Sequence, residues 1–416
     1  MITKKKMALL NVLEPSTLDE GIEGIEFHTH YPFASTSLVH EDEIVISIQH
    51  QDIYTLPWQS YIYMEGKFTK ENNDPPDATI NLTNNAFAFL FDEIRYELNG
   101  VEIDRVRNLG LTTTMKGYLT HSMNDKHIFG NYGWTSSPLQ YYSNITQEGY
   151  FNVCIPLAFL LSFADDHKKV IVNMKQELIL IRSRRDENCY MSVPNNENQL
   201  TQAKIQLSKL FLRMPYVTVS PSQKLTLLHH LEKGLVLNLN FRSWELYEYP
   251  LLPRNRNHIW CVKTTTQIEK PRYVIIGFQT SRKNEIGKTA SRFDHCNITN
   301  LKLFLNSKVY PYDDLNLDFT KGYFALLYHM YCAFRSSYYP NTDPSPILSR
   351  YNFGLSPMIV LDCSKQSDSI KTGSIDVRLE FESDTIFPAD TAAYCLIIHN
   401  RVVEYSPFTG NVRRLV

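Results

Sequence analysis

The feature that most constrains this chain is a strand–turn–strand segment that occurs twice, about half the chain length apart. The first copy has Asn99-Gly100 at its turn, and the second has Asn306-Ser307, which lies 207 residues later in a chain of 416 residues. Asn-Gly between alternating apolar residues is the strongest short signal of a β-hairpin, because both turn positions accept a positive φ at low cost. Asn-Ser is a weaker form of this signal. Both segments are therefore predicted to be hairpins.

A segment with helical features follows each hairpin. After the first hairpin it covers residues 111–121, and after the second it covers residues 317–334. The second pattern is clearest over residues 323–334, where apolar residues recur with helical spacing. The shared order of elements, at an offset of half the chain, predicts a tandem duplication in which Asn99 and Asn306 occupy equivalent places.

The rest of the chain is typical of β-structure. Residues 43–49 (EIVISIQ), 204–212 (KIQLSKLFL) and 235–241 (LVLNLNF) alternate apolar and polar side chains, and polar turns separate such segments. We predict an all-β fold with a few helices and about seven to nine strands in each half. The predicted division is an N-terminal arm and lead-in (1–40, irregular), a first β-domain (41–214), a linker (215–233) and a second β-domain (234–416).

Composition excludes several classes of protein. The 42 Lys and Arg residues balance 44 Asp and Glu residues, which argues against a dedicated nucleic-acid-binding domain. Aromatic residues make up 12% of the chain, a level that favours β-structure and large contact surfaces. Seven scattered cysteines without a Cys-x-x-Cys pair indicate reduced thiols in a cytosolic or nuclear protein. No apolar run is long enough for a membrane span, and no signal-peptide cleavage site is recognisable.

The sequence contains no catalytic motif of the common hydrolase, nucleotide-binding or zinc-protease types. His28 and His30 have the spacing of two ligands on one strand face, but we interpret them as ordinary residues of an N-terminal segment. The pairs Asp165-Asp166 and Asp313-Asp314 could bind a divalent cation, yet solvated turns or caps explain them more simply. We therefore predict no catalytic residue, no cofactor and no metal.

Four blocks of sequence resemble arthropod proteins carried by endogenous viruses and virus-like elements. The blocks are residues 91–100 (FDEIRYELNG), 258–260 (HIW), 269–280 (EKPRYVIIGFQT) and 312–317 (YDDLNL). Those proteins are in turn similar to the double jelly-roll major capsid proteins of Polinton/Maverick and adintovirus-like elements. The resemblance begins near residue 27 and is strongest from residue 231 onward.

This resemblance implies two eight-stranded jelly rolls in tandem and a structural role in a virion. Three chains would form a pseudo-hexagonal capsomer, and many capsomers would tile an icosahedral shell around double-stranded DNA. The implied partners are further copies of the chain, penton and minor capsid proteins, and packaged DNA. The protein would be made inside the host cell, in the cytoplasm or nucleus, and would not be secreted.

Candidate contact residues follow from this interpretation. Large amphipathic rings in aromatic loops are plausible interface anchors, although packing within the loops is an equal alternative; these are Tyr141, Tyr142, Tyr338 and Tyr339. Basic residues near both termini would face packaged DNA through salt-dependent, sequence-independent contacts; these are Lys4, Lys5, Lys6, Arg413 and Arg414. The basic run from Arg182 to Arg185 could touch phosphates, but a solvated loop explains it more simply.

Two alternatives from other classes stay open at this point. One is a binding module, either a lectin-like protein with two jelly rolls or a capsid gene reused by a host. A monomeric chain that binds a glycan would favour it. The other is an enzyme on a jelly-roll scaffold, which would need a metal cluster of His and carboxylate side chains or a cleft with paired carboxylates. A metal held by His28, His30 and an acidic residue at about 2–2.5 Å would support it.

Overall fold

The fold is known from a computed structural model that describes most of the chain. It describes residues 21–33, 38–49, 54–195, 197–232, 236–262, 271–306, 308–340, 342–365 and 376–415. Strands dominate both halves, and each half contains two main antiparallel sheets, of six and four strands in the first half and of five and four strands in the second, around a shared apolar core. No helix among the described residues is both long and apolar enough to cross a membrane.

The first half forms two facing sheets. One sheet has the order β1 (Ile22–His30), β12 (Ala203–Val219), β4 (Tyr61–Lys70) and β8 (Tyr150–Pro156). The other has the order β2 (Glu43–Ile48), β10 (Gln176–Arg182), β6 (Phe91–Leu98) and β7 (Val101–Arg107). Short strands are attached: β3 (Tyr54–Thr55) and β9 (Ile171–Val172) to the first sheet, and β5 (Ile80–Leu82) paired with β11 (Tyr190–Ser192).

The second half repeats this arrangement strand for strand. One sheet has the order β13 (Leu237–Tyr249), β20 (Thr391–Tyr405), β15 (Pro271–Thr280) and β18 (Ile359–Asp362), with β21 (Val412–Leu415) added beside β20. The other has the order β14 (Asn257–Val262), β19 (Val377–Ser383), β16 (Ile298–Leu305) and β17 (Lys308–Tyr310). With the eight main strands of each half numbered along the chain, both halves have the orders 1-8-3-6 and 2-7-4-5. This is the double wrapping of a jelly roll, so the predicted fold of two eight-stranded jelly rolls is confirmed.

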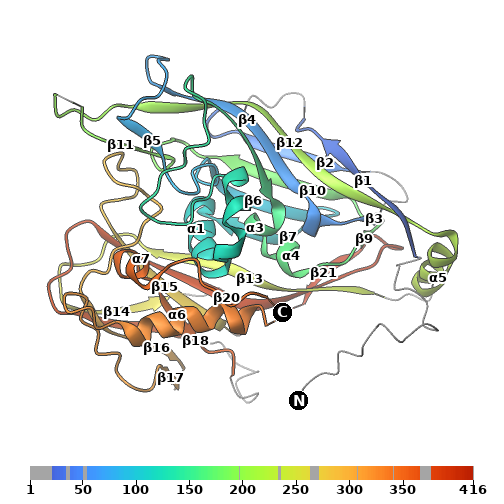
Figure 1. The fold of residues 1–416 in the computed structure, drawn as a ribbon. Helices are drawn as coiled ribbons and strands as arrows, with labels where there is room; N and C mark the ends of the chain where they lie inside the picture. The colour runs from blue at the N-terminus through green and yellow to red at the C-terminus, as the bar shows by residue number, and fades with distance from the viewer. Residues whose placement is uncertain are drawn as a thin grey trace, which may run out of the picture.

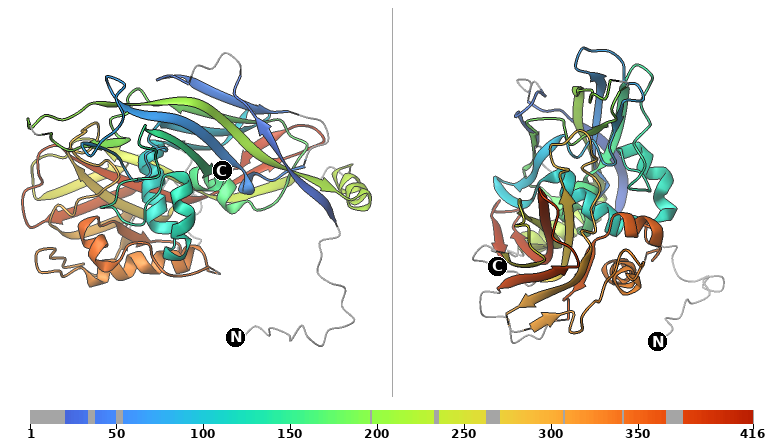
Figure 2. Two further views of the ribbon diagram at one scale, coloured as in Figure 1. Left: turned by 45° about the horizontal axis from the view of Figure 1, so that its top comes forward. Right: turned by 90° about the vertical axis from the view of Figure 1, so that its left-hand side faces the viewer.

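One long helix follows the hairpin in each half, as predicted. These helices are α1 (Leu109–Thr120) and α6 (Ala325–Tyr338), and they lie side by side (Figure 2), where the Tyr331 hydroxyl donates to the Tyr118 carbonyl at 2.6 Å. The helix after the second hairpin begins at Ala325 rather than at residue 317, because Asp318 and Tyr323 pair across a tight turn first. The other helices are α2 (Lys126–Phe129), α3 (Leu157–Leu160), α4 (Ser162–Asp166), α5 (Pro221–Glu232), α7 (Arg350–Leu355), η2 (Pro57–Gln59), η3 (Met123–Asp125) and η4 (Gly130–Tyr132).

The two asparagine turns make the same contacts in equivalent hairpins. Asn99 and Asn306 have φ values of 48° and 52°, in the left-handed region that asparagine tolerates. The Asn99 N–H donates to the Lys175 carbonyl at 2.9 Å, and its side-chain oxygen accepts from the Lys175 N–H at 3.0 Å. Asn306 makes the same pair of bonds with Asp376, at 3.1 and 2.8 Å. Ser307, the other turn residue predicted there, lies outside the described residues.

Two predictions about local structure were wrong. Residues 22–30 were expected to be irregular, but they form β1, because their backbone pairs along the edge of β12 with His28 opposite Met214. Residues 124–144 were expected to form one long loop, but η3, α2 and η4 occupy their first part. Strand β12 also runs past the predicted boundary at residue 214 and ends at Val219, so the connection between the halves consists of α5 and its flanks.

The jelly rolls lie side by side in the same orientation, which gives the molecule two different ends (Figure 1). The linker end carries α5 and the turn at Asn99, and there the Asn99 side chain donates to the Gly410 carbonyl at 2.7 Å. The loop end carries the connections 183–202, 281–297 and 384–390. There, the Ser192 N–H donates to the Ile286 carbonyl at 2.6 Å.

Candidate assembly surfaces and a basic pocket

A charged contact joins the two jelly rolls near the linker end. Arg242 on β13 donates to Asp166 at the end of α4 from its backbone N–H and its Nε, both at 2.8 Å. Its guanidinium carbon lies 3.4 Å from the centre of the Tyr338 ring. Burial lowers the pKa of Arg242, but pairing with Asp166 outweighs burial and the net shift is upward, so the guanidinium stays charged.

A second polar contact crosses the junction in the core. Asp104 on β7 is fully buried, accepts from the Phe163 N–H at 2.9 Å and lies 4.0 Å from a guanidinium nitrogen of Arg401 on β20. Burial raises the pKa of Asp104, and Arg401 opposes that shift. Arg401 also donates to Glu245 at 2.8 Å. Buried polar contacts of this kind fix one relative orientation of two packed units, so the chain presents two jelly rolls as a single block.

The four predicted interface tyrosines fall into two groups. Tyr142 and Tyr338 are buried within the chain, where the Tyr142 hydroxyl donates to the Gly130 carbonyl and Tyr338 accepts from the indole of Trp244. Their burial argues against a role as anchors between chains. Tyr339 is half-buried with its hydroxyl on Asp165 at 2.7 Å, and Tyr141 keeps 37% of its surface exposed.

The structure describes only two of the five basic residues predicted near the termini. Lys4, Lys5 and Lys6 lie outside the described residues. Arg413 and Arg414 are exposed on β21, and a guanidinium nitrogen of Arg414 lies 3.6 Å from Glu102 of the first jelly roll. Both arginines therefore lie on the strand that follows the turn at Gly410, which contacts the linker end.

The basic run that begins at the end of β10 has one buried arginine and two exposed arginines. Arg182 is buried, pairs with Asp186 at 2.5 Å and donates to the Leu90 carbonyl at 2.7 Å. Arg184 and Arg185 are exposed and lie within 3.5 and 3.3 Å of Glu41 and Glu187, respectively. The run therefore begins with a residue that stabilises the loop and only then reaches solvent.

The candidate metal ligands have other partners. His28 stacks on Tyr216 with ring centres 4.2 Å apart, and a ring nitrogen of His30 lies 3.1 Å from the hydroxyl of the same tyrosine. Asp165 lies 3.2 Å from Lys116, and Asp314 lies 2.7 Å from Lys302. Within the described ranges, no group of three or more His, Cys, Asp or Glu side chains could hold a metal ion.

Aromatic side chains cover part of the outer side of the sheet β1-β12-β4-β8. They are Phe27, Tyr31, Tyr61, Tyr63 and Phe211, and we call this surface the aromatic face. Its rings contact one another across the strands: Phe27 with Tyr61 at 5.9 Å, Tyr31 with Phe211 at 5.5 Å, and Phe211 with Tyr63 at 4.6 Å. Phe27 and Tyr31 are 42% and 61% exposed. This surface was missed from the sequence because β1 was not recognised, although Phe27, Thr29 and Tyr31 have the period of one strand face.

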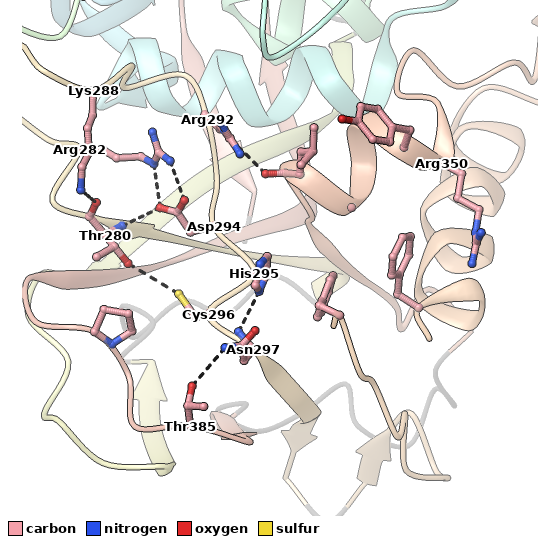
Figure 3. Close-up of a pocket in the computed structure, with 16 residues that line it drawn as sticks. Thr280, Arg282, Lys288, Arg292, Asp294, His295, Cys296, Asn297, Arg350 and Thr385 are labelled. Atoms are coloured by element: carbon pink, nitrogen blue, oxygen red, sulfur yellow. Dashed lines mark hydrogen bonds and ion pairs between the residues drawn. The ribbon is translucent and has the colours of Figure 1, made fainter. Parts of the chain in front are cut away.

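A cavity of about 750 Å³ opens at the loop end of the second jelly roll (Figure 3), and we call it the basic pocket. Its wall comes from residues 280–297, from the segment between β17 and β18, and from the connection before β20. Its basic residues are Arg282, Lys288, Arg292 and Arg350. Asp294 holds Arg282 by two bonds, at 2.7 and 2.6 Å.

A stack of rings forms another wall of the basic pocket. His295 lies on Phe319 with ring centres 4.9 Å apart, and Phe319 lies on Phe324 at 5.4 Å. Arg350 covers the Phe324 ring at 4.9 Å. Burial lowers the pKa of His295, and its Nδ1 accepts from the Asn297 N–H at 3.0 Å, so the ring is neutral with its proton on Nε2.

Comparisons with known proteins agree with the strand topology. Residues 80–403 match the family described as Double jelly roll-like domain. No curated protein matches the sequence at a significant level. The structure is similar to that of a chain of the Sputnik virophage, with a TM-score of 0.60 and 8% identity over 100% of this chain and 93% of that chain.

Two further solved structures share the fold. The Faustovirus major capsid protein has a TM-score of 0.61 and 8% identity, over 94% of this chain and 92% of that chain. The mavirus major capsid protein has a TM-score of 0.58 and 12% identity, over 98% and 92% of the two chains. Since the family match spans most of the chain and both halves have its strand order, this chain belongs to the double jelly roll-like domain family.

Proposed function

We propose that the chain is a viral major capsid protein, of the kind found in Polinton/Maverick or adintovirus-like elements, and that it acts by assembly rather than catalysis. The observation that carries this proposal is the double jelly roll that the chain shares, over nearly its whole length, with the mavirus and Faustovirus major capsid proteins. Asp165 and Asp314 pair with Lys116 and Lys302, which favours a structural role for these carboxylates over metal-dependent catalysis.

The junction supports a building block with two lobes. Because Arg242 and Asp104 fix the two jelly rolls in one orientation, three chains would present six similar lobes and fill a pseudo-hexagonal position in a shell. The aromatic face is the surface that fits a contact between chains. Large rings are enriched at the centres of protein interfaces, and Phe27 and Tyr31 are exposed in the single chain.

The two ends of the molecule suit the two sides of a shell. In this proposal the linker end, with Arg413 and Arg414 beside it, faces double-stranded DNA, and Lys4, Lys5 and Lys6 add contacts with that DNA. Such contacts would be independent of DNA sequence and sensitive to salt. The loop end then faces outward, and penton and minor capsid proteins complete the virion.

Size-exclusion chromatography with light scattering, combined with negative-stain microscopy, tests the assembly. We expect a species of three chains, each of 48.4 kDa, or closed shells. A double variant, Phe27→Ser with Tyr31→Ser, should shift the protein toward monomer, whereas Phe408→Ser, at a ring that is 77% exposed but outside the aromatic face, should not. A chain that stays monomeric at high concentration would overturn the proposal. Deletion of residues 1–6 should lower the amount of nuclease-protected DNA.

A further inference from the structure

We propose that the basic pocket is a binding site for a sulfated oligosaccharide. The proposal deepens the proposed function, because a capsid whose loop end faces outward would use such a site to hold an anionic glycan on a cell surface. The charge, the wall and the size of the pocket carry the inference, and each stands without the assembly itself.

The charge of the pocket is strongly one-sided. Asp294 is already neutralised by Arg282. The hydrogen bonds of Lys288, Arg292 and Arg350 go to backbone carbonyls, of Thr280 at 3.2 Å, Leu355 at 3.2 Å and Gly322 at 3.0 Å, and not to carboxylates. Within the part of the chain that the structure describes, none of these three cations forms an ion pair. Their remaining N–H groups can therefore donate to an anion.

The contrast with a second cavity shows that this imbalance is not general. That cavity, of about 740 Å³, lies between the jelly rolls, and its charged residues nearly balance. They are Asp92, Glu93, Arg107, Arg184, Arg185, Glu248 and Lys283. Lys283 there pairs with Glu248 at 2.8 Å, and Arg107 pairs with Glu93 at 3.3 Å. Of these two cavities, the basic pocket is therefore the one in which several cationic side chains, unpaired among the described residues, line the same cavity.

The chemistry of the wall favours a sulfated sugar over a nucleic acid. Phe319 stacks with His295 and Phe324, and Phe324 also contacts Arg350, so these rings are engaged within the wall and are poor platforms for stacking on bases. Tyr351 lines the pocket and is 72% exposed, so its ring can pack against the apolar face of a sugar. Guanidinium groups bind planar pairs of oxyanion oxygens with two parallel bonds.

The size of the pocket also fits a short glycan. A volume of about 750 Å³ lies within the roughly 300–1,000 Å³ typical of small-ligand sites, which is far from an extended track for a polymer backbone. The site is built on a rigid frame, because Arg282 and Asp294 clamp the start of its main loop to Thr280, whose N–H donates to Asp294 at 2.9 Å. A preformed site of this kind loses little entropy on binding.

Titration calorimetry of the full-length protein with a heparin-derived tetrasaccharide tests the proposal. We expect binding that weakens as salt rises and at least a tenfold weaker Kd in the double variant Lys288→Ala with Arg350→Ala. Both side chains are exposed, so the variant should fold, and circular dichroism checks this. The variant Arg184→Ala with Arg185→Ala, in the second cavity, is the matched control and should bind normally.

Five outcomes separate the possibilities. Equal binding of the desulfated tetrasaccharide, or loss of binding only in the second-cavity variant, would overturn the proposed site. Tighter binding of a single-stranded DNA oligonucleotide through the same residues would identify a nucleic-acid site and reject the glycan. A monomer that binds the tetrasaccharide supports the pocket but rejects the capsid proposal, whereas shells that do not bind it retain the capsid proposal and reject the pocket.

Discussion

Replacement of Asn306 and Asn99 with alanine or glycine tests whether the two hairpin turns do the same work in both jelly rolls. Each asparagine has a positive φ and accepts a bond from the residue just before the neighbouring strand, Asp376 or Lys175. The Asn99 amide also donates to the Gly410 carbonyl at 2.7 Å, which links the first jelly roll to the C-terminal segment, and it makes a long contact of 4.0 Å with the Met174 sulfur. The two sites thus form a matched pair that differs mainly by the bond to Gly410.

The expected costs follow from these contacts. Alanine in the left-handed region costs about 1 kcal/mol, and an exposed side-chain hydrogen bond contributes about 0.5–1 kcal/mol. Asn306→Ala should therefore lower the free energy of unfolding by about 2 kcal/mol, and Asn306→Gly by about 0.5–1 kcal/mol, because glycine keeps the backbone unstrained. Asn99→Ala should cost about 0.5–1 kcal/mol more than Asn306→Ala, because the bond to Gly410 is also lost.

Urea denaturation followed by tryptophan fluorescence measures these differences from the shift in midpoint at constant slope. Equal effects of alanine and glycine at Asn306 would refute the role of the left-handed conformation. An Asn99→Ala variant that is no less stable than Asn306→Ala would show that the Gly410 bond contributes nothing.

Three further perturbations have defined outcomes in the same denaturation assay. Arg242→Ala should lower stability by about 3 kcal/mol, because it leaves the carboxylate of Asp166 unpaired at the junction. Gly117→Ala should cost about 1–3 kcal/mol, because a Cβ there would lie 2.5 Å from the Trp134 ring. Burial lowers the pKa of His121 from the usual 6.5 of histidine to about 3. Between pH 6.5 and pH 3 the unfolded state therefore binds a proton at this residue that the folded state does not bind. Stability should fall over that window by up to about 1.4 kcal/mol per pH unit, and His121→Phe should remove this slope.

Each of these variants has a control within the chain. Arg378→Ala breaks an exposed pair with Glu380 and a contact with the Phe304 ring, and it should change stability by less than about 1 kcal/mol. Gly24→Ala meets no atom within 4 Å and should be tolerated. His229→Phe, at an exposed position on α5, should leave the pH profile unchanged. A control that matched its test variant would contradict the mechanism assigned to that site.

Local rules were enough to predict much of this fold. The Asn-Gly turn, the alternating strands and the helical spacing over residues 323–334 all act between neighbours in the chain, and the structure has a hairpin, strands and helix α6 there. The resemblance of residues 91–100 to viral proteins added the count of eight strands in each jelly roll. Local rules failed at β1, because Gly24 interrupts its pattern and its pairing partner lies almost 190 residues away, at Met214.

The amino-acid sequence by itself determined the duplication, the β-rich class and the place of the two turns, since these depend on backbone preferences within a few residues. Only the tertiary structure decided which side chains meet. Arg242 finds Asp166 across 76 residues, and Arg292, Phe319 and Arg350 reach one pocket from three separate segments. The neighbouring residues Tyr141 and Tyr142 have the same side chain, but Tyr142 is buried and Tyr141 is exposed, and only the structure shows this difference. The physical reason is that closure of a jelly roll joins distant strands, and the sequence pattern contains no record of which loops that closure brings together.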